Sequence, residues 1–336
     1  MHWKAEGSMR YVAASLALMM SAYVLCVEGA GDALGQGYPT RAVKLVVPLA
    51  VGGPADTTAR LFATALAETI GQNVLVENRV GASGVVGTET VVRSAPDGYT
   101  LLFGSSSSFA VNPAVIKNLR FDVRRDLKLI GLVSQTHFVL VVRAGSPLKS
   151  LADVVREAKA EPGKLSYASS GTGGIIHLTQ ELFNLEAGIK LVHIPFRGGG
   201  PALIGVLAGD ADMGFIDIST VLAQVRSGKM LPLGLAATER SAMLPEVPTV
   251  IELGYPQVET RSWYGLATPA GVPREVIARL ERATGIIAAS PTFQEGLQKV
   301  GLQPLVMTPA ETAAFIAHDL DKWIRVARSA KIETDQ

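Results

Sequence analysis

The stretch V-V-P-L-A-V-G-G-P-A-D, from Val46 to Asp56, decides the predicted fold, and a second stretch of the same design, Y-A-S-S-G-T-G-G-I-I-H, runs from Tyr167 to His177. In each, an apolar strand-like run breaks at small residues and a helical pattern begins at once. Such a turn leaves backbone N–H groups free at a helix N-terminus. Two of these turns predict a small anion held from both sides, although glycine at such a place can also serve only to bend the chain.

Around these turns the sequence alternates strand and helix. Val43 to Ala50 is a nearly continuous apolar run, as expected of a strand covered on both faces. Pro54 opens a helix that Gly71 closes, and further strands are predicted at 73–78 and 99–104. This β-α-β-α-β order predicts a parallel sheet with right-handed crossovers.

The alternation repeats in the second part of the chain. Strands are predicted at 137–143, 165–169, 190–196, 212–217, 231–237 and 263–268, and the last of them is followed by helices that open at Pro273, Pro291 and Pro309. We predict two α/β lobes, with the chain crossing between them near 135–140 and 245–260. Lobe 1 then comprises residues 37–137 and 255–336, and lobe 2 comprises residues 138–254.

The composition is that of a well-buried globular protein. The chain has 336 residues, of which 48% are hydrophobic and 18% charged, and its formal net charge is +1. That length is enough for two domains. No block of like charge occurs, so nothing predicts a nucleic acid or an anionic membrane surface as a partner.

The first 36 residues have the pattern of a targeting segment. Lys4 and Arg10 precede an uncharged apolar run from Tyr11 to Val27, and a polar stretch follows. We expect residues 1–36 to be a Sec-type signal peptide, cleaved on export to the periplasm; an uncleaved membrane anchor is the alternative. Met9 is an alternative start. Cys26 is the only cysteine, so cleavage would leave no thiol for a disulfide, a metal or nucleophilic catalysis.

Motifs of several enzyme classes are missing. The chain has no G-x-S-x-G, no phosphate-binding G-x-x-x-x-G-K-[ST] and no H-E-x-x-H, and G-T-G-G-I-I-H fails the dinucleotide pattern at its third glycine. No two of the five histidines have metal-ligand spacing. His177 is interpreted as a structural, hydrogen-bonding histidine rather than a general base. We therefore expect no catalysis, no cofactor and no metal.

Other candidate ligand-binding residues follow predicted strands. Ser105 and Ser106 begin a run of four serines whose hydroxyls suit carboxylate oxygens, and Asn112 offers an amide. Arg197 ends a strand and is either a bidentate carboxylate clamp or a surface arginine. Asp217 ends another strand and either selects an amino group or a hydroxyl, or caps the next helix.

From Tyr38 onward the chain resembles the Bug (TctC-type) extracytoplasmic solute-binding proteins of tripartite tricarboxylate transporters. The resemblance rests on a series of motifs in the same order: Y-P-T-R-A-V-K-L-V-V-P, G-G-P-A-D-T-T-A-R, V-E-N-R-V-G-A-S-G, A-P-D-G-Y-T-L-L, G-T-G-G-I-I-H-L, I-P-F-R-G-G-G-P-A-L, L-A-G-D-A-D-M, P-T-V-I-E-L-G-Y and W-Y-G-L-A-T-P-A-G-V-P.

The resemblance implies an α/β protein with the type II periplasmic-binding-protein fold, two α/β lobes joined by crossover strands with a ligand cleft between. It implies a small carboxylate ligand (a di- or tricarboxylate, an acidic amino acid or an aromatic acid) and delivery to an integral membrane permease by a monomer. The ligand-binding residues that it implies are Leu49, Val51, Gly52, Gly53, Asp56, Ser169, Ser170, Gly171, Thr172, Gly173 and Gly174.

Three of these positions depart from the family pattern. Leu49 replaces a phenylalanine that usually follows the proline, Val51 adds bulk, and Gly174 stands where a serine or threonine is common. The ligand itself is therefore not predicted. Two other functions stay open: a sensing subunit for a membrane histidine kinase, and a hydrolase that would use Ser105 to Ser108 and lacks an evident base. A DNA-binding regulator is disfavoured by the export signal.

Overall fold

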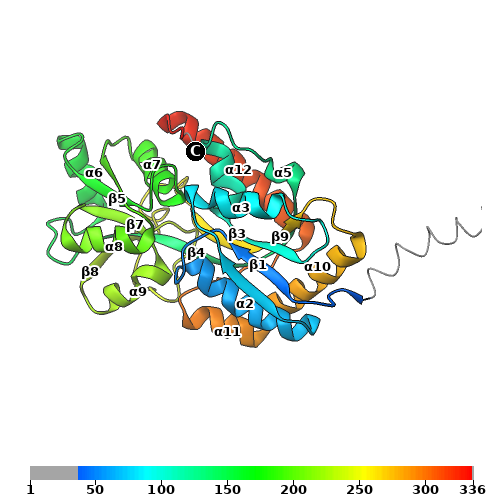
Figure 1. Cartoon of the computed structure of the whole chain (residues 1–336). Coiled ribbons are helices and arrows are strands. Elements are labelled where there is room, and N and C mark those ends of the chain that lie inside the picture. Colours follow the sequence, from blue (N-terminus) through cyan, green and yellow to red (C-terminus); the bar gives the residue numbers. More distant parts are fainter. Residues whose placement is uncertain (1–36, 335–336) are drawn as a thin grey trace, which may run out of the picture.

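A ten-stranded sheet runs through residues 37–334, which are the residues that the computed structural model describes (Figure 1). Its main order is β2-β1-β3-β9-β4-β7-β5-β6, and β8 and β10 each pair with β4. The bounds of the strands are β1 Val43–Val47, β2 Val74–Asn78, β3 Thr100–Ser105, β4 Leu127–Arg143, β5 Ser166–Ser169, β6 Val192–Pro195, β7 Met213–Asp217, β8 Met230–Leu235, β9 Arg261–Pro269 and β10 Gln303–Pro304.

Helices pack on the sheet in both halves of the molecule (Figure 1). A 3₁₀ turn, η1, and a π-helical turn, η2, complete the helical elements. The bounds are α2 Pro54–Ile70, η1 Ala82–Gly84, α3 Val85–Val92, η2 Ser107–Val111, α4 Asn112–Val115, α5 Val123–Asp126, α6 Leu151–Ala160, α7 Ile175–Ala187, α8 Gly199–Ala208, α9 Ile218–Arg226, α10 Arg274–Ala289, α11 Pro291–Lys299 and α12 Pro309–Ala330.

The first three strands are parallel, as predicted. Along β1, Val43 and Leu45 point into the apolar layer that contains Phe62 of α2 and Leu280 of α10. Val46 points into a second layer on the other face. A strand whose two faces are both covered is expected to be apolar throughout, which explains the apolar run from Val43 to Ala50.

β4 joins the two halves of the sheet. It pairs antiparallel with β9 as far as His137, and with β7 from Phe138 onward. The sequence predicted only the second half of this 17-residue strand. The first half was missed because polar residues such as Ser134 and Thr136 interrupt its apolar pattern, yet both are fully buried at the crossover.

The second half of the sheet contains a parallel group, β7-β5-β6, with β7 and β8 both antiparallel to β4. The predicted strands in this region agree with the structure to within a few residues. The helix after the glycine run, α8, begins at Gly199. Its N-cap is Gly198, with φ +116°, a conformation that favours glycine.

The C-terminal helix α12 connects the halves. It contacts α4 and η2 of the first half and α7 of the second. The indole of Trp263 on β9 donates from Nε1 to Asp319 Oδ2 at 2.9 Å, which fixes this helix to the sheet. A capping box between Thr308 and Glu311 starts α12, consistent with the predicted helix opening at Pro309.

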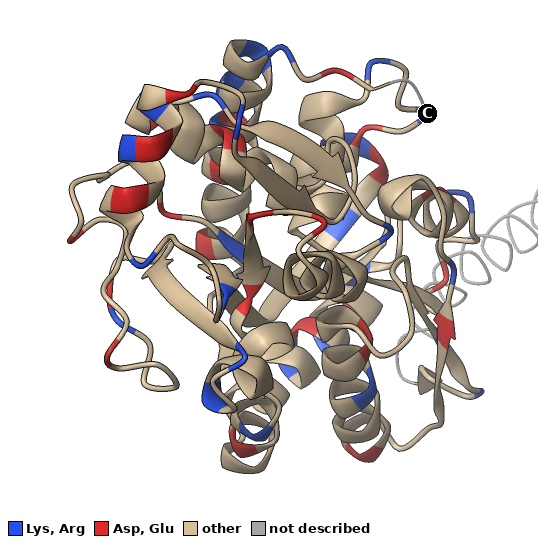
Figure 2. Ribbon diagram, turned by 90° about the vertical axis from the view of Figure 1, so that its left-hand side faces the viewer, with Lys and Arg blue, Asp and Glu red and all other residues tan. Residues whose placement is uncertain are grey.

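The charged residues are dispersed. Figure 2 shows basic and acidic residues interspersed over the helices of both halves, in keeping with a net charge of +1. Within residues 37–334 no helix combines the length and the apolar character that a membrane crossing requires. The same residues contain no cluster of three or more His, Cys, Asp or Glu side chains that could hold a metal ion. The predicted signal peptide and Cys26 lie outside the described residues.

Candidate functional site

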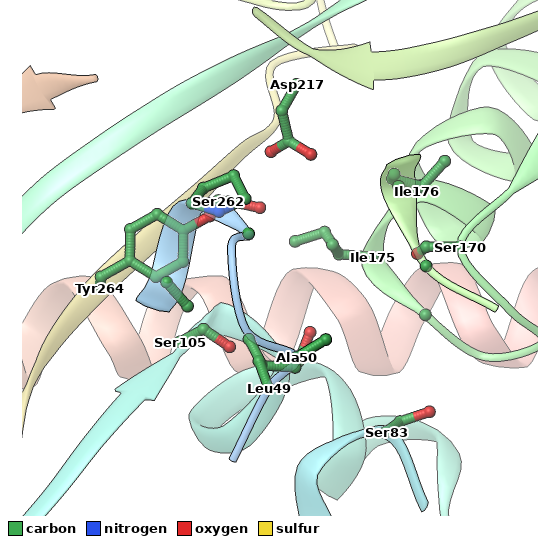
Figure 3. A pocket seen from close by; sticks show the side chains of 17 residues that line it. Leu49, Ala50, Ser83, Ser105, Ser170, Ile175, Ile176, Asp217, Ser262 and Tyr264 are labelled. Carbon is green, nitrogen blue, oxygen red and sulfur yellow. The ribbon is translucent and has the colours of Figure 1, made fainter. Parts of the chain in front are cut away.

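A pocket of about 220 Å³ lies where strands from both halves of the sheet end (Figure 3). The last residues of β3 and β7 line it, together with the segments that follow β1, β2, β3, β5 and β6, and β9 contributes two side chains. In α/β sheets, ligands bind beyond the carboxyl ends of the strands. The lining residues are Leu49, Ala50, Gly53, Pro54, Ala55, Ser83, Ser105, Ser107, Ser170, Gly174, Ile175, Ile176, Gly198, Gly199, Asp217, Ser262 and Tyr264.

Three helices begin at this pocket with glycine as their N-cap. These glycines are Gly53 for α2, Gly174 for α7 and Gly198 for α8, and no side chain caps any of the three helices. By contrast, Ser150 caps α6 and Thr308 caps α12, and neither residue lines the pocket. First-turn N–H groups have no partner within the helix. At the pocket they are therefore available to a ligand, and the helix dipoles favour an anion there.

Asp56 stabilises the first glycine turn without lining the pocket. Its carboxylate is buried and accepts hydrogen bonds from Gly52 N–H at 2.9 Å, Arg60 Nε at 3.0 Å and Asn78 Nδ2 at 3.0 Å. Burial acts to raise the pKa of Asp56, but the hydrogen bonds from Arg60, Gly52 and Asn78 outweigh it and lower the pKa. Gly52 has φ +80°, a conformation that favours glycine. Asp56 therefore holds the turn rather than contacting the ligand space.

The second turn is held by two stacked histidines. His177 Nδ1 accepts a hydrogen bond from Gly173 N–H at 3.1 Å, and His193 Nε2 lies 2.6 Å from Ser169 Oγ. The two imidazole rings stack with their centroids 3.8 Å apart. Ser169 Oγ also accepts from Gly171 N–H at 3.1 Å. The hydrogen bond from Gly173 N–H to His177 Nδ1 confirms the structural role predicted for His177.

Both histidines are kept neutral by their surroundings. Burial, and then the neighbouring His193 ring, lowers the pKa of His177 to about 3. Burial lowers the pKa of His193 to about 4. A neutral His177 leaves Nδ1 able to accept from Gly173 N–H, whereas a protonated ring would present a donor there. The geometry of the second turn thus depends on uncharged imidazoles.

We expect the natural protein to lose stability relative to a His177→Asn variant as the pH falls below about 6.5. In this range His177 is protonated in the unfolded chain, whereas the buried ring in the folded protein stays neutral. The free energy of unfolding therefore falls by about 1.4 kcal/mol per pH unit. Asparagine keeps an acceptor near the position of Nδ1 but does not titrate. Urea unfolding of both proteins at pH 7.5, 6, 5 and 4.5 measures the difference. A difference that stays constant over this range would contradict the prediction.

Asp217 is the one charged residue among the described lining residues, and it is buried. It is the N-cap residue of α9, but its side chain makes no capping hydrogen bond, so the capping role left open by the sequence is wrong. Its side chain is 7% exposed, and its Oδ1 atom has no hydrogen-bond partner within residues 37–334. Burial raises the pKa of Asp217 to about 7, against a smaller lowering by hydrogen bonds that include the Ser262 hydroxyl.

Tyr264 lies beside this carboxyl group in Figure 3. Burial, and then the charge of Asp217, raises the pKa of the Tyr264 phenol well above its usual value, so the phenol stays protonated. On the other side of the pocket, Ser105 Oγ is buried without a hydrogen-bond partner in the described residues. Both hydroxyls line the pocket, and each can hydrogen-bond to a ligand.

The structure brings six of the fifteen predicted ligand-binding residues together at the pocket: Leu49, Gly53, Ser105, Ser170, Gly174 and Asp217. The other nine do not line it: Val51, Gly52, Asp56, Ser106, Ser169, Gly171, Thr172, Gly173 and Arg197. Val51, Thr172 and Arg197 are exposed. Most of the remainder support the two turns through the contacts described above.

Several lining residues were not predicted. Ser83 comes from the G-A-S-G loop and is held by Asn112, whose Nδ2 donates to the Ser83 carbonyl at 3.0 Å. Gly198 and Gly199 follow Arg197 directly, but only Arg197 was predicted as a candidate ligand-binding residue of this segment. Ser262 and Tyr264 carried no signal, because β9 is antiparallel and presents them from within a strand rather than from a loop after one.

Known proteins share this architecture over most of the chain. The protein is 36% identical to "Protein BugT" of Bordetella pertussis, across 87% of this chain and 90% of that protein. The structure of R. palustris Rpa4515 with adipate is 29% identical, with a TM-score of 0.82 and coverage of 89% of this chain and 100% of that chain. MatC from Rhodopseudomonas palustris with bound malate is 29% identical, with a TM-score of 0.78 and coverage of 86% and 99%.

A family model gives the same result. The model described as "Tripartite tricarboxylate transporter family receptor", TctC, matches residues 58–332, a range that includes most of the first helix and every later lining segment of the pocket. The two-lobed α/β architecture expected from the resemblance is likewise that of solved periplasmic binding proteins. The chain therefore belongs to the TctC family of tripartite tricarboxylate transporter receptors.

Proposed function

We propose that this protein is a periplasmic solute-binding protein that captures a small carboxylate and performs no catalysis. The observation that carries the proposal is the convergence of three glycine-capped helix N-termini on one pocket. None of the described lining residues is Lys, Arg or His. The ligand carboxylate is therefore held by backbone N–H groups and serine hydroxyls rather than by a side-chain cation.

The solved relatives support a carboxylate ligand. One is titled with adipate and another with bound malate. Both ligands are small acids, and both relatives superpose on nearly the whole described chain. Leu49, Ile175 and Ile176 supply the apolar part of the lining here, which suits the carbon skeleton of such an acid.

Closure of two lobes around the ligand completes the proposed mechanism. We place one lobe boundary between residues 137 and 138, where β4 changes partner from β9 to β7. The sequence placed the other between 254 and 255; the hydrogen bond from Thr260 N–H to Ala236 O supports a boundary at 260/261 instead. The pocket draws residues from both lobes, so ligand contacts would favour the closed state.

Family membership supports a proposal for the location of the protein and for the delivery of its ligand. We propose export by cleavage of residues 1–36, action as a monomer, and transfer of the captured acid to the integral membrane permease of a tripartite tricarboxylate transporter. The family description names receptors of such transporters.

Thermal unfolding in the presence of paired ligands tests the proposal. Purified protein is heated with each of about a hundred small carboxylic acids and with the matching primary amides. A ligand that binds only the folded state stabilises it by about 2.7 kcal/mol at a concentration of 100 times Kd. We expect at least one acid to raise Tm and its amide to leave Tm unchanged, and titration calorimetry then gives Kd. A rise in Tm with neutral sugars or cations, and with no acid, would overturn the proposal.

A further inference from the structure

Asp217 is the single formally charged side chain that lines the pocket in the described part of the chain. Its carboxyl group is nine-tenths buried and makes no ion pair within residues 37–334. A buried carboxylate is ordinarily paired with a cation or a metal ion, because desolvation of an unpaired charge is costly. The protein thus presents a carboxyl group whose cationic partner is missing from its own described residues.

The carboxyl group is aimed at the ligand space rather than at its own helix. Figure 3 shows it pointing into the pocket, opposite Ser105 and Leu49. No described residue forms a hydrogen bond with Oδ1. On the other flank, a Cβ built on Gly199 would lie 3.6 Å from Asp217 Oδ2, so the glycine at this helix start leaves room beside the carboxyl group.

The charge balance distinguishes between classes of acid. A dicarboxylate would bring a second carboxylate to a pocket whose one formally charged side chain among the described residues, Asp217, repels an anion when it is ionised. An acid that also carries a protonated amine adds no net charge, and it supplies a cation at a point where the described lining residues have none. Its carboxylate would occupy the helix N-termini, and its ammonium group would donate to Asp217.

We propose that Asp217 is a specificity residue that binds the ammonium group of the ligand, so that the solute is an amino acid or another small acid with a primary amine. The inference rests on the proposed capture of a carboxylate. Ser262 and Tyr264 line the same part of the pocket as Asp217. Their hydroxyl oxygens can accept hydrogen bonds from the remaining ammonium N–H groups.

Matched ligand series test the assignment. Calorimetry compares γ-aminobutyrate with succinate, γ-hydroxybutyrate and butyrate; β-alanine with malonate and propionate; and alanine with lactate and propionate. The proteins are the natural chain, Asp217→Asn, and Asp210→Asn as a matched control on an exposed aspartate of the same half. In at least one series the amine is expected to bind at least about tenfold more tightly than its dicarboxylate or unsubstituted partner. Asp217→Asn should weaken that binding about 100-fold, and Asp210→Asn should leave it unchanged.

The outcomes separate the two proposals. If acids bind but a dicarboxylate binds best in every series, and Asp217→Asn leaves or improves its affinity, the ammonium assignment falls and carboxylate capture stands. If the hydroxy acid equals the amine, Asp217 selects a neutral donor and the assignment also falls. If no acid of any series or of the wider panel binds, both proposals fall. Tighter binding of succinate by Asp217→Asn, together with weaker binding of the amine, would support the assignment most directly.

Discussion

The unliganded Asp217→Asn variant is expected to gain stability over the natural protein as the pH rises from about 4 to about 7. Burial raises the pKa of Asp217 from 3.8 to about 7. Between these values the unfolded chain has released the proton and the folded protein retains it, so the natural protein loses stability as the pH rises. A shift of about three pKa units corresponds to about 4 kcal/mol, and this penalty persists above pH 7. Asparagine has no such penalty.

Urea unfolding of both proteins at pH 5, 6, 7 and 8, without ligand, measures this difference. The buried histidines contribute the opposite slope to each protein, but their contribution cancels when the two curves are subtracted. Asp210→Asn provides the control for loss of one exposed carboxylate, and its curve should run parallel to that of the natural protein. A difference between Asp217→Asn and the natural protein that does not change with pH would show that Asp217 titrates normally.

Such a gain would mean that the natural protein keeps Asp217 at a cost in stability. Buried polar groups that destabilise the free protein are common where the ligand supplies their partner. Selection for stability alone would replace Asp217 with a neutral residue. The expected rise in stability of Asp217→Asn and its expected loss of amine affinity therefore have the same cause, a buried carboxyl group to which the described residues supply no cation.

The sequence predicted the sheet well where one physical rule determined the pattern. β1 could be recognised because both of its faces are buried, and α12 because Pro309 stands in its first turn. β4 could be recognised only in part. Near its crossover, buried polar residues such as Ser134 make tertiary hydrogen bonds, in this case to Thr58 of α2, and no local periodicity records such contacts.

The glycine turns of the site could be predicted from the sequence, but most of the side chains that line the pocket could not. Glycine N-caps are visible in a sequence because only a small residue followed by a helical pattern produces them, and Gly53 and Gly174 both line the pocket. Ser262 and Tyr264 reach it through the antiparallel pairing of β9 with β3 and β4. That pairing depends on tertiary structure. Val51 shows the converse error, because adjacency to a glycine turn did not bring its side chain into the pocket: it is 70% exposed.

A Gly53→Asp substitution is expected to abolish most carboxylate binding while leaving the protein folded. Gly53 is the N-cap of α2, with φ −79° and ψ 172°, which is the conformation that aspartate adopts at N-caps. A Cβ there meets only Ala50 O at 3.5 Å, an ordinary contact. The new carboxylate would accept from the free N–H groups of the first turn and add a few tenths of a kcal/mol of stability. It would occupy the place of the ligand carboxylate and repel it, lowering affinity on the order of 100-fold.

Two further variants identify the cause of that loss. Gly53→Ala adds the same Cβ without a charge or a cap, so it should weaken binding far less than aspartate does. Gly145→Asp adds the same charge at an exposed glycine with open space around it, and it should leave binding unchanged. Calorimetry with the best acid from the thermal screen provides the affinities, and urea unfolding provides the stabilities. If alanine and aspartate at residue 53 weaken binding equally, the effect is steric, and the helix N-terminus of α2 is not where the carboxylate binds. If aspartate alone weakens it, the substituted side chain reproduces the anion that this uncapped helix is built to receive.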